Sequence, residues 1–92
     1  MQINVYTVIS GVKFIIMIIK THPMNSSNIS RAGYDDESKT LEVQFNTGKI
    51  YRYDNVPRVM YDEMFKSTSP GGYFRKWIIG GKYKFNKIDK KK

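Results

Sequence analysis

The sequence predicts an α+β domain, with a three-stranded antiparallel β-meander followed by two short α-helices packed on one face of the sheet. Three observations lead to this prediction. Residues 41–45 alternate apolar with polar side chains, which is the period of a half-buried strand. Residues 46–48, Asn-Thr-Gly, then provide a short turn with a glycine available for positive φ. Residues 60–78 carry two apolar stripes at helical spacing, separated by a Pro-Gly-Gly break.

The register of the hairpin over residues 41–56 decides which side chains share a face. A three-residue loop, with Gly48 in the left-handed region, places apolar and aromatic side chains on one face and an opposite-charge pair on the other. A two-residue loop would mix the two faces, so the hydrophobic pattern selects the first register. The predicted pairs are Phe45 with Lys49, Val43 with Tyr51, Leu41 with Tyr53, and Glu42 with Arg52. We therefore expect Tyr51 and Tyr53 to point toward the core.

A first strand is expected over residues 27–34, before the hairpin. Ile29 is its clearest apolar contributor, and a polar loop at residues 35–39 leads from it into the hairpin. Gly33 lies inside this strand, where an isolated glycine predicts a β-bulge.

Two helices are expected after the hairpin. Pro57 suits the first turn of the first helix, and Ser69 and Pro70 are the predicted N-cap and first residue of the second. Residues 80–81, Gly-Gly, end the second helix. The two apolar stripes are Met60, Tyr61, Met64 and Phe65, then Tyr73, Phe74, Trp77 and Ile78. We expect Trp77 to be largely buried.

Ninety-two residues make one domain, and composition divides the chain into three parts. Residues 1–23 form an apolar leader, which we expect to be an extension upstream of the domain at residues 24–81; Met17 is an alternative start. Residues 82–92 form a basic C-terminal tail. The net charge is +8, and residues 67–92 hold eight basic residues against one acidic residue. This distribution favours anionic partners.

Six short motifs follow one another between residues 24 and 80. They are Ser26-Ser27-Asn28-Ile29, Gly33-Tyr34-Asp35, Leu41-x-Val43-x-Phe45-x-x-Gly48, Tyr51-Arg52-Tyr53, Val56-Pro57 with Tyr61, and Ser69-x-Gly71 with Tyr73-Phe74. The ordered series resembles the KTSC domain family, which also occurs at the C-terminus of some lysyl-tRNA synthetases and as short proteins of bacteria and phages. The resemblance implies a domain without catalytic activity, for which RNA binding has been suggested. It does not extend to the apolar leader or the basic tail.

Basic residues interleaved with aromatic ones near the C-terminus suit a nucleic-acid backbone with some base stacking. The candidate nucleic-acid-binding residues are Arg52, Arg75, Lys76, Lys82 and Lys84, and the candidate stacking residues are Tyr51 and Tyr53. The alternative is a solvated tail that binds polyanions without biological meaning. Arg52 either meets a partner on the open sheet face or is neutralised by Glu42. The two tyrosines either stack bases or fill the core, and the register favours the core.

The turn between the two helices is a candidate anion-binding site. Ser69, Gly71 and Gly72 would present backbone N–H groups to an anion, with Arg75 and Lys76 one turn further along. The alternative is an ordinary capped turn. The turn does not have the Gly-x-x-x-x-Gly-Lys-Ser/Thr pattern of a phosphate-binding loop.

No catalytic assembly can be drawn from these residues. The chain has no cysteine and one histidine, His22, so we expect no enzymatic activity, no cofactor and no metal site. Lys13 interrupts the apolar leader and would cost about 2.5–3.5 kcal/mol at a bilayer centre, which argues against a membrane span. The lack of cysteine suits a reducing compartment, and we expect a cytoplasmic location.

These observations lead us to expect an accessory module that binds nucleic acid, above all RNA, through phosphate contacts with little base preference. The alternative is a protein-interaction module or a binder of a small anionic ligand such as a nucleotide, encoded by a phage. A continuous basic surface over the sheet and tail would favour the first function. A small pocket at Gly71 and Gly72 would favour the second.

Overall fold

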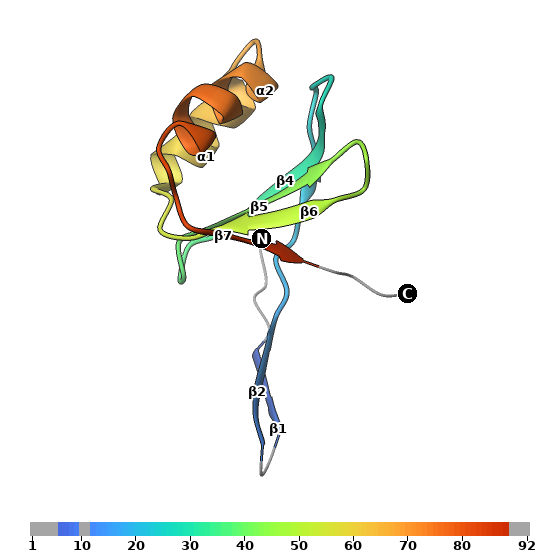
Figure 1. The fold of residues 1–92 in the computed structure, drawn as a ribbon, viewed down its shortest axis with the longest axis vertical. Helices are drawn as coiled ribbons and strands as arrows, with labels where there is room; N and C mark the ends of the chain where they lie inside the picture. Colours follow the sequence, from blue (N-terminus) through green and yellow to red (C-terminus); the bar gives the residue numbers. More distant parts are fainter. Residues whose placement is uncertain (1–5, 10–11, 89–92) are drawn as a thin grey trace.

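The chain folds into a five-stranded antiparallel sheet with helices on one face, and a separate two-stranded hairpin (Figure 1). The computed structural model describes residues 6–9 and 12–88. The sheet order is β3-β4-β5-β6-β7. Its strands are β3 (His22–Pro23), β4 (Ile29–Asp35), β5 (Thr40–Phe45), β6 (Ile50–Tyr53) and β7 (Phe85–Ile88). The predicted α+β class is confirmed, but the predicted count of three strands is wrong.

The hairpin of β5 and β6 has the predicted register. Leu41 pairs with Tyr53, Glu42 with Arg52 and Val43 with Tyr51, and the amide of Phe45 donates to the carbonyl of Lys49 at 2.9 Å. Gly48 has a φ of 93°, as the three-residue loop requires. The pattern of apolar side chains thus identified the register correctly.

The two additional strands lie at the edges of the sheet. β3 comprises two residues of the predicted leader and pairs with β4, and β7 comprises residues of the predicted tail and pairs with β6. β3 has only two residues, which are too few to show an alternation. Residues 82–87 alternate basic with apolar side chains, a pattern that suits a short strand or an extended arm, and the structure has a strand there. Its partner β6 is distant in sequence, so local pattern did not predict the pairing.

Gly33 is explained by a close approach between backbones, so the predicted bulge at this residue is wrong. The register of β4 against β5 shifts between Ile29 and Arg31 instead. A Cβ atom on Gly33 would lie 2.1 Å from the carbonyl oxygen of Lys20. The chain therefore crosses the sheet at Gly33, on the face opposite the helices, and Ile19 is buried there with 3% of its surface exposed.

The leader also contains a second, independent hairpin. β1 (Tyr6–Ile9) pairs antiparallel with β2 (Val12–Met17), with a shift in register between Val8 and Ile9. Figure 1 shows this hairpin extending away from the five-stranded sheet. The apolar leader expected at residues 1–23 lies partly outside the described residues.

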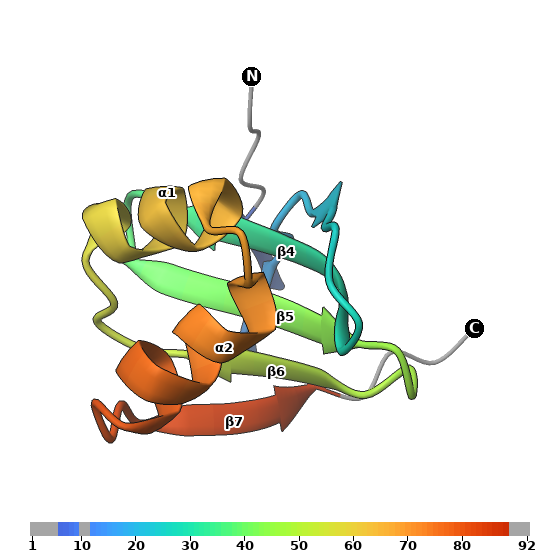
Figure 2. The same cartoon turned by 90° about the horizontal axis from the view of Figure 1, so that it is seen from above.

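The helices cover one face of the sheet, as predicted (Figure 2). They are α1 (Arg58–Lys66), α2 (Pro70–Tyr73) and a π-helical continuation of α2, η1 (Phe74–Ile79). The hydroxyl of Ser69 accepts a hydrogen bond from the amide of Gly72 at 3.3 Å, which confirms the predicted N-cap. Below the helices, the core includes Ile29, Ala32, Tyr34, Leu41, Val43, Tyr53, Val56, Met64, Phe74 and Ile78.

Trp77 is 46% exposed, so the prediction that it is largely buried is wrong. Phe74 and Ile78, four residues apart, supply the buried contacts of this helix, with 4% and 1% of their surface exposed. Trp77 lies beside this pair, on the outward side of the helix. The predicted stripe was two residues wide, and spacing alone did not decide which of its sides faces the sheet.

Candidate nucleic-acid interface

Arg52 lies on the sheet face opposite the helices and makes an ion pair with Glu42. Its Nε atom donates to Oε1 of Glu42 at 2.8 Å, and the two side chains are 15% and 1% exposed. The backbone at Lys20 crosses the same face at Gly33, which pairs with Glu42. Of the two interpretations of Arg52, neutralisation by Glu42 therefore has geometric support, and little of the guanidinium is accessible to a partner.

Tyr51 and Tyr53 both lie on the helix side, but they differ in burial. Tyr53 is 4% exposed, and its ring centroid lies 5.4 Å from that of Phe74 and 5.6 Å from that of Phe85. Burial, with a smaller contribution from Tyr51, raises the pKa of the Tyr53 hydroxyl to about 12. Tyr51 is half-buried. Tyr53 thus belongs to the core, whereas Tyr51 lies at its margin.

Tyr51 is the middle member of a row of three rings that crosses the sheet diagonally from β7 to β5. Its centroid is 5.8 Å from Phe85 on β7 and 5.9 Å from Phe45 on β5. Phe45 is half-buried and Phe85 is 55% exposed. We call Phe45, Tyr51 and Phe85 the aromatic row. By register, Phe45 and Tyr51 lie closer to the β5–β6 turn than Tyr53 does, and Figure 2 shows the sheet extending beyond the helices toward that turn. Phe85 pairs with Tyr53 and lies on the edge strand β7.

Three basic side chains border the aromatic row. Lys87 alternates with Phe85 on β7 and pairs with Tyr51, so it lies on the same face as the rings. Arg75 and Phe45 line one cavity, and Lys82 and Phe85 line another. We call Arg75, Lys82 and Lys87 the basic border. None of the three forms an ion pair with any residue that the structure describes.

The other two candidate cations lie elsewhere. The Nζ atom of Lys76 lies 5.1 Å from the ring centroid of Trp77, on the outward side of the helix. Lys84 precedes β7 and is exposed, and its carbonyl accepts a hydrogen bond from the amide of Asp54 at 2.8 Å. By strand alternation its side chain points away from the face that carries Phe85.

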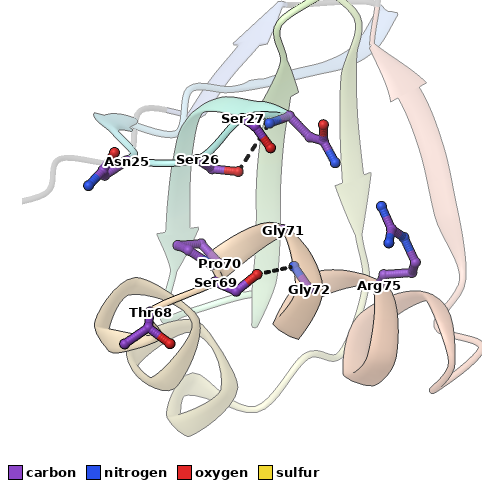
Figure 3. Close-up of a pocket in the computed structure, with 10 residues that line it drawn as sticks. Asn25, Ser26, Ser27, Thr68, Ser69, Pro70, Gly71, Gly72 and Arg75 are labelled. Atoms are coloured by element: carbon purple, nitrogen blue, oxygen red, sulfur yellow. Dashed lines mark hydrogen bonds between the residues drawn. The ribbon is translucent and has the colours of Figure 1, made fainter.

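The inter-helix turn faces a loop at residues 25–28 across a polar cavity of about 350 Å³ (Figure 3). In the loop, the hydroxyl of Ser26 accepts hydrogen bonds from the amides of Asn28 and Ile29, both at 3.2 Å. At the turn, Ser69 accepts from the amide of Gly72 through its hydroxyl and from that of Tyr73 through its carbonyl. Two amides near the start of this helix are therefore already satisfied, which weakens the hypothesis of an anion site built from backbone N–H groups alone.

An apolar cavity adjoins the polar one. It is also about 350 Å³, and its apolar lining is Ile29, Phe45, Phe74 and Ile79. Asn28, Gly71 and Arg75 line both cavities. A Cβ atom on Gly71 would lie 3.2 Å from the Ser26 hydroxyl, so the glycine keeps the space between loop and helix open.

The structure thus adds residues that the sequence did not assign to a site. Phe45 was expected only on the apolar face of the hairpin, and Ser26-Ser27-Asn28 only as part of the first family motif. The signal for the loop was its run of four hydrogen-bonding side chains, Asn-Ser-Ser-Asn. Its contact with Gly71 could not be predicted, because the two segments are distant in sequence.

Within residues 6–9 and 12–88, no group of three or more His, Cys, Asp or Glu side chains is placed to hold a metal ion. Over the same part of the chain, no helix has the length and apolar character needed to cross a bilayer.

Comparisons with known proteins agree with the fold. The family model of the KTSC domain matches residues 25–83. An uncharacterized protein of Stutzerimonas stutzeri is 32% identical over 71 residues, which are 77% of this chain and all of that protein. A crystal structure of a KTSC domain protein from Yersinia pestis superposes with a TM-score of 0.70 at 33% identity, covering 78% of this chain and 100% of that one.

Two of the similar proteins are much longer enzymes. The lysine–tRNA ligases of Nostoc punctiforme and Trichormus variabilis are 32% and 34% identical to this chain over 62 residues. The match covers 67% of this chain but only 11% of each ligase. The similarity therefore concerns one small segment of each ligase.

Proposed function

This chain belongs to the KTSC domain family, and from that premise we propose that it is a small accessory module that binds single-stranded nucleic acid, above all RNA. The observation that carries the proposal is the aromatic row with its basic border. Rings that remain partly accessible provide surfaces on which unpaired bases stack, at about 1–3 kcal/mol per base. The neighbouring cations provide phosphate contacts.

The charge of the surroundings supports the same proposal. Asp36 and Asp62 pair with Arg58 at the start of α1. Glu63 on the same helix accepts a hydrogen bond from the hydroxyl of Tyr73 at 2.7 Å. Glu42 pairs with Arg52 on the opposite sheet face. These carboxylates are thus engaged away from the aromatic row, and the basic border can attract an anionic backbone at short range.

The similarity to segments of lysine–tRNA ligases also supports RNA as the nucleic acid. The names of those enzymes state that they act on tRNA, and the matching segment is a small part of each. An accessory segment that contacts RNA would be useful to such an enzyme. For this chain the partner is an RNA with exposed, unpaired bases, because stacking on the aromatic row requires access to a base face.

The proposal is tested by titrating the full chain with a single-stranded RNA at two salt concentrations. The triple variant R75Q/K82Q/K87Q removes the basic border, and K90Q/K91Q/K92Q removes the same number of charges from the C-terminal end as a matched control. We expect the first variant to lower the slope of log affinity against log salt by about 2, since each single-strand phosphate contact contributes about 0.7. The control should retain most of the slope.

Two results would contradict the proposal. If both triple variants change the slope equally, attraction is generic and the folded surface has no special role. If the unmodified chain does not bind RNA at low salt, the module has another partner.

A further inference from the structure

We infer that the two adjoining cavities between the loop at residues 25–28 and the helix at residues 70–79 receive one nucleoside monophosphate unit. The base enters the apolar cavity and the phosphate enters the polar one. This inference rests on the proposed function and deepens it, because it names the chemical unit that is held and where it is held. The unit can be a free nucleotide or the end of a strand.

The apolar cavity suits a nucleobase. Two aromatic rings, Phe45 and Phe74, and two branched aliphatic side chains, Ile29 and Ile79, line it, and the two rings meet edge to face at 5.6 Å. Its volume of about 350 Å³ lies within the range of small-ligand sites. Asn28 is the neutral hydrogen-bonding side chain in this lining, and its amide has both a donor and an acceptor for the edge of a base.

The polar cavity suits a phosphate and a ribose. Hydroxyl and amide groups supply most of its lining, and Arg75 is its cationic side chain. No Asp or Glu of the described chain lines either cavity, so a phosphate meets no repulsion from the walls. A guanidinium binds phosphate oxygens in a bidentate geometry, which gives Arg75 the leading role in holding the anion.

The residues that line both cavities indicate where the base, the sugar and the phosphate of the nucleotide lie. Gly71 lies where the cavities meet, and the absence of a side chain leaves room there for a sugar. Arg75 also borders both spaces, so it can reach a phosphate while its alkyl stem contacts the base. Neither a bare phosphate nor a purely apolar ligand would use both halves.

Phe45 connects this double cavity with the aromatic row, because it belongs to both. A single-stranded nucleic acid whose bases stack on Phe85 and Tyr51 would reach Phe45 next, and Phe45 lines the apolar cavity. This continuity favours a nucleotide over other amphiphilic phosphates, since the other rings of the row offer the same stacking chemistry to the next bases.

The test is a chemical-shift titration of the full, isotope-labelled chain with adenosine monophosphate, adenosine and inorganic phosphate as separate probes. We expect adenosine monophosphate to shift the amides of Gly71 and Gly72 and the methyl groups of Ile79. Each of the other two probes should bind about tenfold more weakly, because it fills only one cavity. Equal binding of all three probes, or shifts confined to residues outside the two cavities, would overturn the inference.

Two variants with matched controls locate the site. Arg75→Gln should weaken adenosine monophosphate binding about tenfold, while Lys66→Gln on α1, which lines neither cavity, should not. Ile79→Ser should weaken both adenosine and adenosine monophosphate, while Val59→Ser should not; these two side chains are 51% and 57% exposed, so neither change should unfold the chain. Equal effects of a variant and its control would also overturn the inference.

A pair of RNA strands, identical except for a terminal phosphate, separates the two sources of the nucleotide. If the phosphorylated strand binds more tightly than both its unphosphorylated twin and adenosine monophosphate, the cavities hold a strand end. If the free nucleotide binds as tightly as the phosphorylated strand, they hold a free nucleotide, and both results support the inference. If RNA binds in a salt-dependent way but adenosine monophosphate causes no chemical-shift change, the inference is overturned and the proposed function stands. If adenosine monophosphate binds but RNA does not, the proposed function is contradicted and the inference stands.

Discussion

Two parts of the same sheet face differ in what covers them. Under α1 and η1, Leu41 is fully buried and Tyr53 is 4% exposed. Along the aromatic row, Tyr51 is only half-buried and Phe85 is 55% exposed, although the same strand alternation places all of them on one face. Alternation therefore determines the face to which a side chain points. The cover of the helices and, for Phe85, its place on the edge strand β7 determine whether the side chain contributes to the core or to a surface.

The largest effect is expected on the sheet face opposite the helices. The ion pair of Arg52 with Glu42 is largely buried there, so this face offers little accessible surface to a nucleic acid. Arg52→Gln leaves the carboxylate of Glu42 buried without its cationic partner, and we expect a loss of about 3–5 kcal/mol in the free energy of unfolding. Urea denaturation measures this loss. At a temperature where the variant is still folded, RNA binding should keep its salt slope, and a reduced slope would show that Arg52 contacts the nucleic acid.

The covered part of the helix-side face should be the next most sensitive to truncation. Met64 on α1 is fully buried, so Met64→Ala should lower the free energy of unfolding by about 2–5 kcal/mol. Val59 on the same helix is 57% exposed, and Val59→Ala should change it by less than about 0.5 kcal/mol. Similar losses for the two variants in urea denaturation would mean that α1 does not pack on the sheet as described.

The smallest expected effect is on the pH dependence of stability, and it involves Tyr53 on the part of the sheet face that the helices cover. The pKa of Tyr53 is about 12 in the folded chain and about 10 when the tyrosine is exposed, so the folded state retains the proton more strongly. Its contribution to stability is complete below pH 10 and is lost as the pH rises through 12. Tyr53→Phe should therefore lose less stability than the unmodified chain between pH 10 and 12. Identical alkaline profiles in thermal unfolding would indicate that Tyr53 is accessible to solvent.

The sequence predicted those features that depend on local pattern. The turn at Asn46-Thr47-Gly48 and the alternation on either side of it were sufficient for the register of β5 and β6, and Ser69-Pro70 was sufficient for the start of the second helix. Each of these features is determined by residues within a few positions of one another. The family resemblance was likewise confirmed, since it rested on an ordered series of such motifs.

Other features depend on contacts between distant segments, and these were missed. The partner of β7 is β6, with an entire helical region between them, and Gly33 is explained by the backbone of Lys20. The candidate site has the same character, because the double cavity forms where the loop at residues 25–28 meets Gly71. Trp77 shows a different limit, since helical spacing did not decide which side of a broad stripe is buried.

The central claim, that the aromatic row is the nucleic-acid surface, is tested most directly by comparing two exposed aromatic residues. Phe85 and Trp77 are 55% and 46% exposed, but Phe85 belongs to the row and Trp77 lies on the outward side of the helix beside Lys76. We predict that Phe85→Ser weakens binding of a single-stranded RNA by about 1–3 kcal/mol and that Trp77→Ser leaves it unchanged. Weaker binding by the Trp77 variant with normal binding by the Phe85 variant would contradict the account and place the nucleic acid on the outward face of the helix.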